Sequence, residues 1–233
     1  MIRTLQNRYV VVNGDLKSSR KLKDRAEVQE ELKNALRIVN RRFGEEIPAK
    51  FVVVGGDSFQ GMLSSPKYLF DIYYVFFENI SHQFYLGIGI GGISTGLSEN
   101  VGEIDGEAFH KASEALEMAK RKNMWIAYKS EREIEGVVTC LLNFMADVMW
   151  SWTKRQREIV TYYRKVKNEK SSVTLEEVAE GIGIKKQTLS KILKRSKYKL
   201  LKEAEDTLVD FISQKWLTDG YKPKMADKRE MVK

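Results

Sequence analysis

The stretch KFVVVGGDSFQGML, residues 50 to 63, contains two apolar runs separated by two glycines and an aspartate. Residues 51–54 and 59–63 are expected to pair as strands, because adjacent glycines tolerate the positive φ angles that a tight hairpin loop requires. Asp57 would then lie at the tip of this hairpin. Aspartate is a common turn residue, so the hairpin by itself predicts structure rather than chemistry.

Further strands and helices are predicted on both sides of the hairpin. Residues 9–13 form a short apolar strand that ends at Gly14 and Asp15, and residues 24–43 carry apolar side chains at helical spacing. Later elements are expected to be helices at 66–79 and 105–121 and strands at 82–92 and 125–129. This order predicts an α+β fold with a ferredoxin-like, palm-type antiparallel sheet that has helices on one face.

The predicted topology brings two acidic side chains together. In a ferredoxin-like sheet the first strand lies beside the third and runs antiparallel to it. Asp15, at the end of the first strand, would therefore meet Asp57, at the start of the third. Two carboxylates without histidine suit Mg²⁺ or Mn²⁺, hard ions that take oxygen ligands and often share them with substrate phosphates. Asp15 and Asp57 are the predicted metal ligands.

The segment LKSSR, residues 16–20, offers groups that suit a triphosphate. Turn N–H groups, two hydroxyls and two cations bind phosphate oxygens well, and glycines let a nucleotide approach the backbone closely. For LKSSR alone, a turn that caps the following helix is the simpler interpretation. The predicted nucleotide-binding residues are Lys17, Ser18, Ser19, Arg20, Gly55 and Gly56.

The run GIGIGG, residues 87–92, fits the spacing of a dinucleotide-binding loop but lacks its context. That motif needs a strand, a tight turn and then a helix N-terminus, whereas here the glycines continue into ISTG. We interpret the glycines as part of a strand that lets backbone or ligand approach closely.

Composition excludes several classes of protein. The chain has 233 residues, one cysteine and two histidines, which leaves no disulfide framework and little room for a zinc site or a histidine-led triad. The N-terminus lacks a signal-peptide pattern. The most apolar run, residues 136–152, is short for a membrane span and contains Asn143 and Asp147. We expect a cytoplasmic protein with no membrane segment.

The positive charge is concentrated in one part of the chain. The net charge is +8, but residues 151–202 hold 15 Lys and Arg against 5 Asp and Glu. Such segregation indicates a nucleic-acid partner, although a solvated lysine-rich surface is the simpler alternative.

Residues 175–195, LEEVAEGIGIKKQTLSKILKR, have the spacing of a helix-turn-helix. Thr174 and Glu177 form a capping box, Ala179 suits a close helix crossing, and Gly183 suits the turn. Residues 185–199 contain seven cations and no acid, which a hairpin used only for packing does not need. The predicted contacts to double-stranded DNA are Lys185, Lys186, Gln187, Ser190, Lys191, Lys194 and Arg195.

Several of these segments resemble known families. NGDLKSSR, KFVVVGGDSFQGML, QFYLGIGIGGISTG and DGEAFHKASEALEMAKRKN look like the SatD family and, more distantly, the palm of class III nucleotidyl cyclases and GGDEF diguanylate cyclases. In those palms a first-strand aspartate and the hairpin aspartate bind the metals, which implies Asp15 and Asp57 here. Ser58 stands where a diguanylate cyclase has a second acid. The basic segment resembles a helix-turn-helix of the sigma-factor region-four type.

These observations predict an organisation and leave three functions open. We expect a palm-like domain at 1–134, an apolar connector helix at 135–152, a helix-turn-helix domain with a terminal helix at 153–215 and a polar tail at 216–233. The chain could be a DNA-binding regulator that senses a nucleoside triphosphate with Mg²⁺, an active Mg²⁺-dependent cyclase or nucleotidyl transferase with a DNA-binding domain, or an adaptor with an inactive palm. The resemblance to cyclases implies a homodimer.

Overall fold

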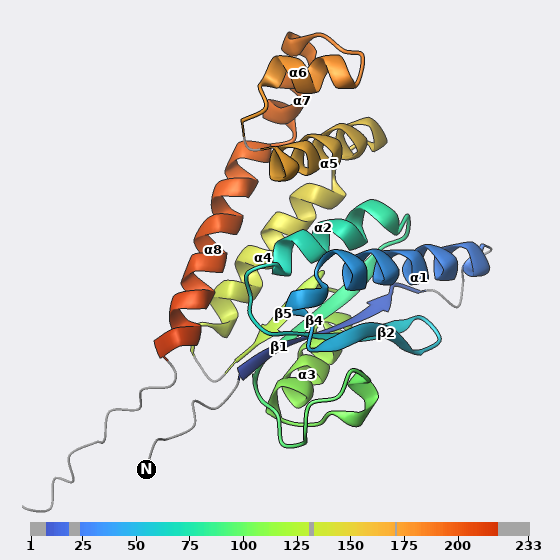
Figure 1. The fold of residues 1–233 in the computed structure, drawn as a ribbon, viewed down its shortest axis with the longest axis vertical. Coiled ribbons are helices and arrows are strands. Elements are labelled where there is room, and N and C mark those ends of the chain that lie inside the picture. The colour runs from blue at the N-terminus through green and yellow to red at the C-terminus, as the bar shows by residue number, and fades with distance from the viewer. Residues whose placement is uncertain (1–7, 19–23, 131–132, 171, 219–233) are drawn as a thin grey trace, which may run out of the picture.

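The computed structural model (Figure 1) describes residues 8–18, 24–130, 133–170 and 172–218. Its elements are β1 (Arg8–Leu16), α1 (Arg25–Arg42), η2 (Gly44–Glu46), β2 (Ala49–Gly55), β3 (Ser58–Leu63), α2 (Leu69–Asn79), β4 (Phe84–Gly92), η3 (Val101–Glu103), α3 (Glu107–Arg121), β5 (Ile126–Lys129), α4 (Glu135–Trp150), α5 (Lys154–Glu169), α6 (Leu175–Gly181), α7 (Lys186–Arg195) and α8 (Tyr198–Thr218). The α+β class predicted from the sequence is confirmed.

The strands form one sheet in the order β2-β3-β1-β4-β5. β1 is the central strand and runs antiparallel to both β3 and β4, with Asp15 opposite Ser58. The predicted pairing of the first and third strands is therefore confirmed. β5, however, runs parallel to β4, so the prediction of a wholly antiparallel sheet is wrong at its last strand. The chain crosses over through α3 between these strands, and such a crossover returns it in the same direction.

Helices cover both faces of the sheet, which corrects the prediction of helices on one face. Figure 1 shows α1 and α2 on one side and α3 on the other. β1 alternates its apolar side chains between the two layers: Val10 and Val12 pack with α1 and α2, whereas Tyr9 and Val11 pack with α3. A strand that is apolar on both faces has to be covered on both.

The glycines of β4 bring the backbone of α3 directly onto the sheet. A Cβ atom at Gly87 would lie 2.2 Å from the backbone nitrogen of Leu116, and one at Gly89 would lie 2.2 Å from that of Ala112. α3 presents alanines to this surface, so the two backbones touch with only small side chains between them. GIGIGG is thus a helix-packing surface, in agreement with our interpretation of the glycines as sites of close backbone approach.

Adding one methyl group at this contact tests it. We expect Gly89→Ala to lower the free energy of unfolding by about 1–3 kcal/mol, because the methyl group would force α3 away from β4. Gly92→Ala is the matched control in the same strand, since nothing lies within 4 Å of its added Cβ, and it should change stability by less than about 0.5 kcal/mol. Chemical denaturation measures both values, and equal losses would contradict the packing described here.

Side chains satisfy backbone groups on both edge strands. Asn143 of α4 accepts from the N–H of Ile126 at 3.2 Å and donates to its carbonyl at 2.5 Å. Thr139, one turn earlier in α4, accepts from another N–H of β5 at 3.1 Å. On the opposite edge, Asn40 exchanges two hydrogen bonds of 2.8 Å with the backbone of Phe51 in β2. The polar residues inside the apolar run of α4 thus hold it along the sheet.

Another face of α4 is exposed and apolar. Val137, Leu141 and Phe144 are each at least 43% exposed and lie one turn apart. The expected homodimer stays a prediction. Among the described residues, no helix combines the length and the apolar character needed to cross a bilayer.

The later helices share the core of the sheet. Val160 of α5 and Leu201, Leu208 and Ile212 of α8 belong to the same buried cluster as α1 and α2.

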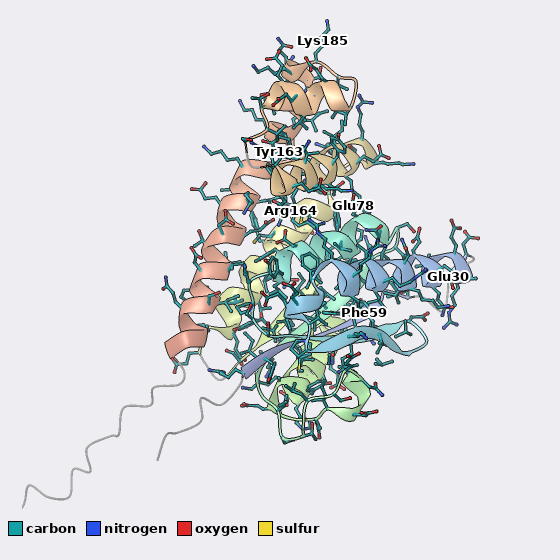
Figure 2. The ribbon with its side chains drawn as sticks, viewed as in Figure 1. Glu30, Phe59, Glu78, Tyr163, Arg164 and Lys185 are labelled. Carbon is teal, nitrogen blue, oxygen red and sulfur yellow. The ribbon has the colours of Figure 1, made fainter. Side chains whose placement is uncertain are left out.

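A buried ionic group lies at the junction between these helices and the sheet. Arg164 of α5 contacts Glu205 of α8 at 2.5 Å and Asp71 of α2 at 2.9 Å. Figure 2 labels Arg164 at this meeting point. Burial raises the pKa of Glu205 above its ordinary value of 4.5, even though Arg164 acts in the opposite direction.

Removing this arginine should destabilise the protein in a pH-dependent way. Arg164→Met leaves Glu205 buried without its cation, which typically costs about 3–5 kcal/mol. Because the folded-state pKa of Glu205 is raised, the folded protein binds an extra proton as the pH falls through that pKa. We therefore expect a larger loss at pH 8 than at pH 5.

Chemical denaturation at the two pH values measures this difference. Lys165→Met removes the neighbouring, exposed cation of α5 and is the control. A loss that is the same at pH 5 and pH 8 would contradict the assignment of the buried charge to Glu205.

Candidate functional site

The first predicted metal ligand, Asp15, lies on the α3 side of the sheet. β1 continues to Leu16 rather than ending before Asp15, and strand alternation directs this side chain toward α3. Its two oxygens are both engaged: Ser58 Oγ donates to Oδ1 at 2.5 Å, and Lys120 Nζ of α3 lies 2.6 Å from Oδ2. The side chain is 17% exposed.

The second predicted ligand, Asp57, is held from the α1 side. It lies in the hairpin turn after Gly56, whose φ is +57°. Arg25 Nη2 donates to Oδ2 at 3.0 Å, and Gln29 Nε2 donates to Oδ1 at 2.9 Å. The side chain is 8% exposed. Residues one helical turn apart at the start of α1 thus hold the hairpin carboxylate.

The structure brings the two aspartates together in the backbone but not in their side chains. The carbonyl of Asp57 accepts from the N–H of Leu16 at 3.2 Å, so the predicted meeting of the strands occurs. Each carboxylate, however, contacts a cation from a different helical layer. Across the described residues, no cluster of three or more His, Cys, Asp or Glu is arranged to hold a metal. Asp15 and Asp57 are thus engaged by Lys120 and Arg25, and their shared binding of a Mg²⁺ or Mn²⁺ ion stays a prediction.

Two of the predicted phosphate-binding residues lie at the turn after β1. Lys17 Nζ is 3.6 Å from the ring centre of Trp125 and 4.5 Å from that of Tyr85. Partial burial lowers the pKa of Lys17. Ser18 is exposed and has a φ of +50°. Ser19 and Arg20 fall outside the described residues.

The glycines of the hairpin expose their backbone. Nothing lies within 4 Å of a Cβ built at Gly55, and only Arg25 Nη2, at 3.6 Å, approaches one built at Gly56. Both residues are exposed. The N–H of Leu16 bonds the carbonyl of Asp57, so Lys17, which follows Leu16, lies at the same end of the strands as the hairpin with Gly55 and Gly56. We name this end of the sheet, with its two aspartates, the hairpin edge.

Sequence reasoning missed the partners of the two acids. Arg25 and Gln29 are spaced by one helical turn, a pattern that predicts a shared face but not its target. Lys120 is 105 positions from Asp15 in the sequence, and only the packing of α3 on the far face brings them together. No local signal identifies such a pair.

The basic segment forms two short helices joined by a turn. Thr174 caps α6 with a reciprocal capping box to Glu177, as predicted. Gly183 in the turn has a φ of +66°, and Ala179 is 1% exposed where the helices cross. Leu189 is the side chain that α7 buries fully.

The predicted DNA contacts lie on the outer face of α7. All of them are exposed. Lys186 forms an ion pair with Glu176 at 3.1 Å. Figure 2 shows Lys185 at the tip of the molecule, at the end far from the sheet. The exposed set is Lys185, Lys186, Gln187, Ser190, Lys191, Lys194 and Arg195.

Comparison with known proteins gives one family. The sequence profile of the SatD family matches residues 9–212, and no curated protein matches the sequence.

Three solved structures of nucleotide cyclases show partial similarity. The guanylate cyclase domain of RhGC from Catenaria anguillulae, solved with GTP, is 14% identical with a TM-score of 0.37, over 48% of this chain and 73% of that one. The catalytic core of a rhodopsin–guanylyl cyclase with converted specificity, solved with ATPαS, is 14% identical with a TM-score of 0.34, over 48% and 72%. A bacterial light-regulated adenylyl cyclase is 15% identical with a TM-score of 0.35, over 52% and 74%.

Proposed function

The chain belongs to the SatD family, and we propose that it binds double-stranded DNA through helix α7. The observation that carries this proposal is the outer face of α7 and its flanks, where residues 185–199 hold seven cations and no acid. These lysines and the arginine are exposed, and Figure 2 shows Lys185 at the end of the molecule far from the sheet. A concentrated exposed cation face suits the phosphate backbone of a duplex.

The geometry of α6 and α7 supports the same proposal. A capped first helix, a turn through a positive-φ glycine and a second helix with an exposed face match the arrangement in which the second helix enters the major groove. Gln187 and Ser190 are exposed near the start of α7 and would face base edges. The lysines would contact phosphates, which position the protein without reading sequence.

Removing lysines from α7 should reduce the salt dependence of DNA binding. Each phosphate contact contributes about 0.9 to the slope of log K against log salt concentration. Combining Lys185→Ala, Lys191→Ala and Lys194→Ala should therefore lower that slope by up to about 2.7. Fluorescence anisotropy with a labelled duplex at several salt concentrations measures it.

A charge-matched variant is the control for this experiment. Combining Lys33→Ala, Lys50→Ala and Lys122→Ala removes the same number of exposed cations from the part of the chain that carries the sheet. If DNA binding responded only to net charge, both variants would lose the same slope, and the assignment to α7 would fail.

A second candidate function is the binding of nucleotide phosphates at the hairpin edge. The observation that favours it is Lys17, an ammonium group that rests on aromatic rings and forms no ion pair within the described part of the chain. The open backbone of Gly55 and Gly56 lies at the same edge. Lys120 and Arg25 contact the two carboxylates, so Mg²⁺ or Mn²⁺ is tested separately and is not part of this proposal.

Calorimetric titration with GTP and ATP tests the second candidate. In EDTA we expect binding that weakens about tenfold or more in Lys17→Met, because a charge-assisted hydrogen bond is lost. The titration is then repeated with Mg²⁺, and the mixture is examined for pyrophosphate and cyclic products. Product that disappears in Asp57→Ala would instead support the cyclase or nucleotidyl transferase alternative, and no binding in either buffer would leave the adaptor alternative.

A further inference from the structure

Two cations and two tryptophans form a continuous series of contacts between the hairpin edge and α5. Lys17 Nζ lies 3.6 Å from the ring centre of Trp125. The rings of Trp125 and Trp150 stack with centres 5.4 Å apart and planes 12° apart. The guanidinium carbon of Arg157 lies 5.1 Å from the ring centre of Trp150. We name this series the tryptophan stack.

The two ends of the tryptophan stack lie in parts of the molecule with different proposed roles. Lys17 follows Asp15 at the turn after β1. Arg157 lies in the first turns of α5, and its guanidinium donates to the carbonyl of Ile80 at 2.9 Å. Trp152, between α4 and α5, donates its indole N–H to the carbonyl of Ser196, which follows α7. The stack therefore ends at α5, which shares a buried cluster with α6 and α7.

Within the described residues, neither Lys17 nor Arg157 forms an ion pair, although Glu31 and Glu78 act electrostatically on Arg157 from a greater distance. Partial burial lowers the pKa of each group. A half-buried ammonium on an aromatic face is attracted more weakly than one that hydrogen-bonds a phosphate. Lys17 is thus placed to exchange its aromatic partner for an anion.

We infer that a phosphate-bearing ligand at the turn after β1 is sensed through the tryptophan stack and alters DNA binding by α7. The ammonium of Lys17 moves from the Trp125 ring to a phosphate oxygen. The loss of this contact changes the packing of Trp125 on Trp150, and Arg157 carries the change to α5. This inference rests on the proposed DNA and nucleotide sites and names how the second regulates the first.

The first measurement is tryptophan fluorescence of the full chain during titration with inorganic triphosphate and with GTP. We expect a saturable change in intensity with both probes, because the cation that contacts Trp125 is removed. Lys17→Met should lose the response, whereas Lys122→Met, an exposed lysine outside the stack, should keep it. Inorganic triphosphate separates phosphate recognition from recognition of the base. Calorimetry under the same conditions reports whether each probe binds.

The second measurement is DNA affinity with and without the saturating probe. Couplings between sites typically change affinity by about fivefold or more. We expect such a change in the wild-type protein and its absence in Lys17→Met and in Trp125→Leu. Because salt alone weakens DNA binding, sodium sulfate at matched ionic strength is the control.

Each outcome has one meaning. A fluorescence response with unchanged DNA affinity, or calorimetric binding without a fluorescence response, overturns the inference while leaving the proposed sites intact. Absence of binding by either probe overturns the nucleotide proposal and this inference together. Absence of DNA binding in the untreated wild-type protein overturns the DNA proposal and with it the regulation proposed here.

Discussion

The direct contact between the backbones of α3 and β4 determines much of the arrangement around the hairpin edge. Gly87 and Gly89 leave no side chain on that face of β4, and Ala112 sits where they leave room. α3 is therefore fixed close to the sheet, and Lys120 near its end reaches Asp15. The same crossover returns the chain parallel to β4 and builds β5, which Trp125 immediately precedes. The partner of one acid and the main aromatic contact of Lys17 both follow from this single packing surface.

The sequence was sufficient to predict the pairing of the first and third strands but not the second helical layer. The order of the elements predicted a ferredoxin-like sheet in which Asp15 would lie beside the third strand, and the register confirms it. Glycines at every second position of β4, facing alanines of α3, carried a signal for close packing that we interpreted only as room for backbone or ligand. The second helical layer is needed because both faces of β1 are apolar. The signal for this is the run of four consecutive buried residues from Tyr9 to Val12.

The candidate site shows the same division between local and distant information. Capping by Thr174, the turn at Gly183 and the exposure of α7 follow from neighbouring residues, so local rules predicted them. The cations that hold Asp15 and Asp57 come from helices on opposite faces of the sheet, and the face toward which Asp15 points follows from its place in the alternation of β1. β1 extends to Leu16 because β3 and β4 both pair with it that far. In the structure the two predicted ligands form separate ion pairs, one with Lys120 and one with Arg25.

The side-chain hydrogen bonds along the outer strands have a consequence for association between molecules. An uncovered edge strand is a template onto which another polypeptide adds, and long flat edges of this kind lead to aggregation. Asn143 and Thr139 occupy the backbone groups of β5 that an incoming strand would use, and Asn40 does so at Phe51 in β2. These hydrogen bonds therefore oppose the addition of an incoming strand at these positions of both outer strands.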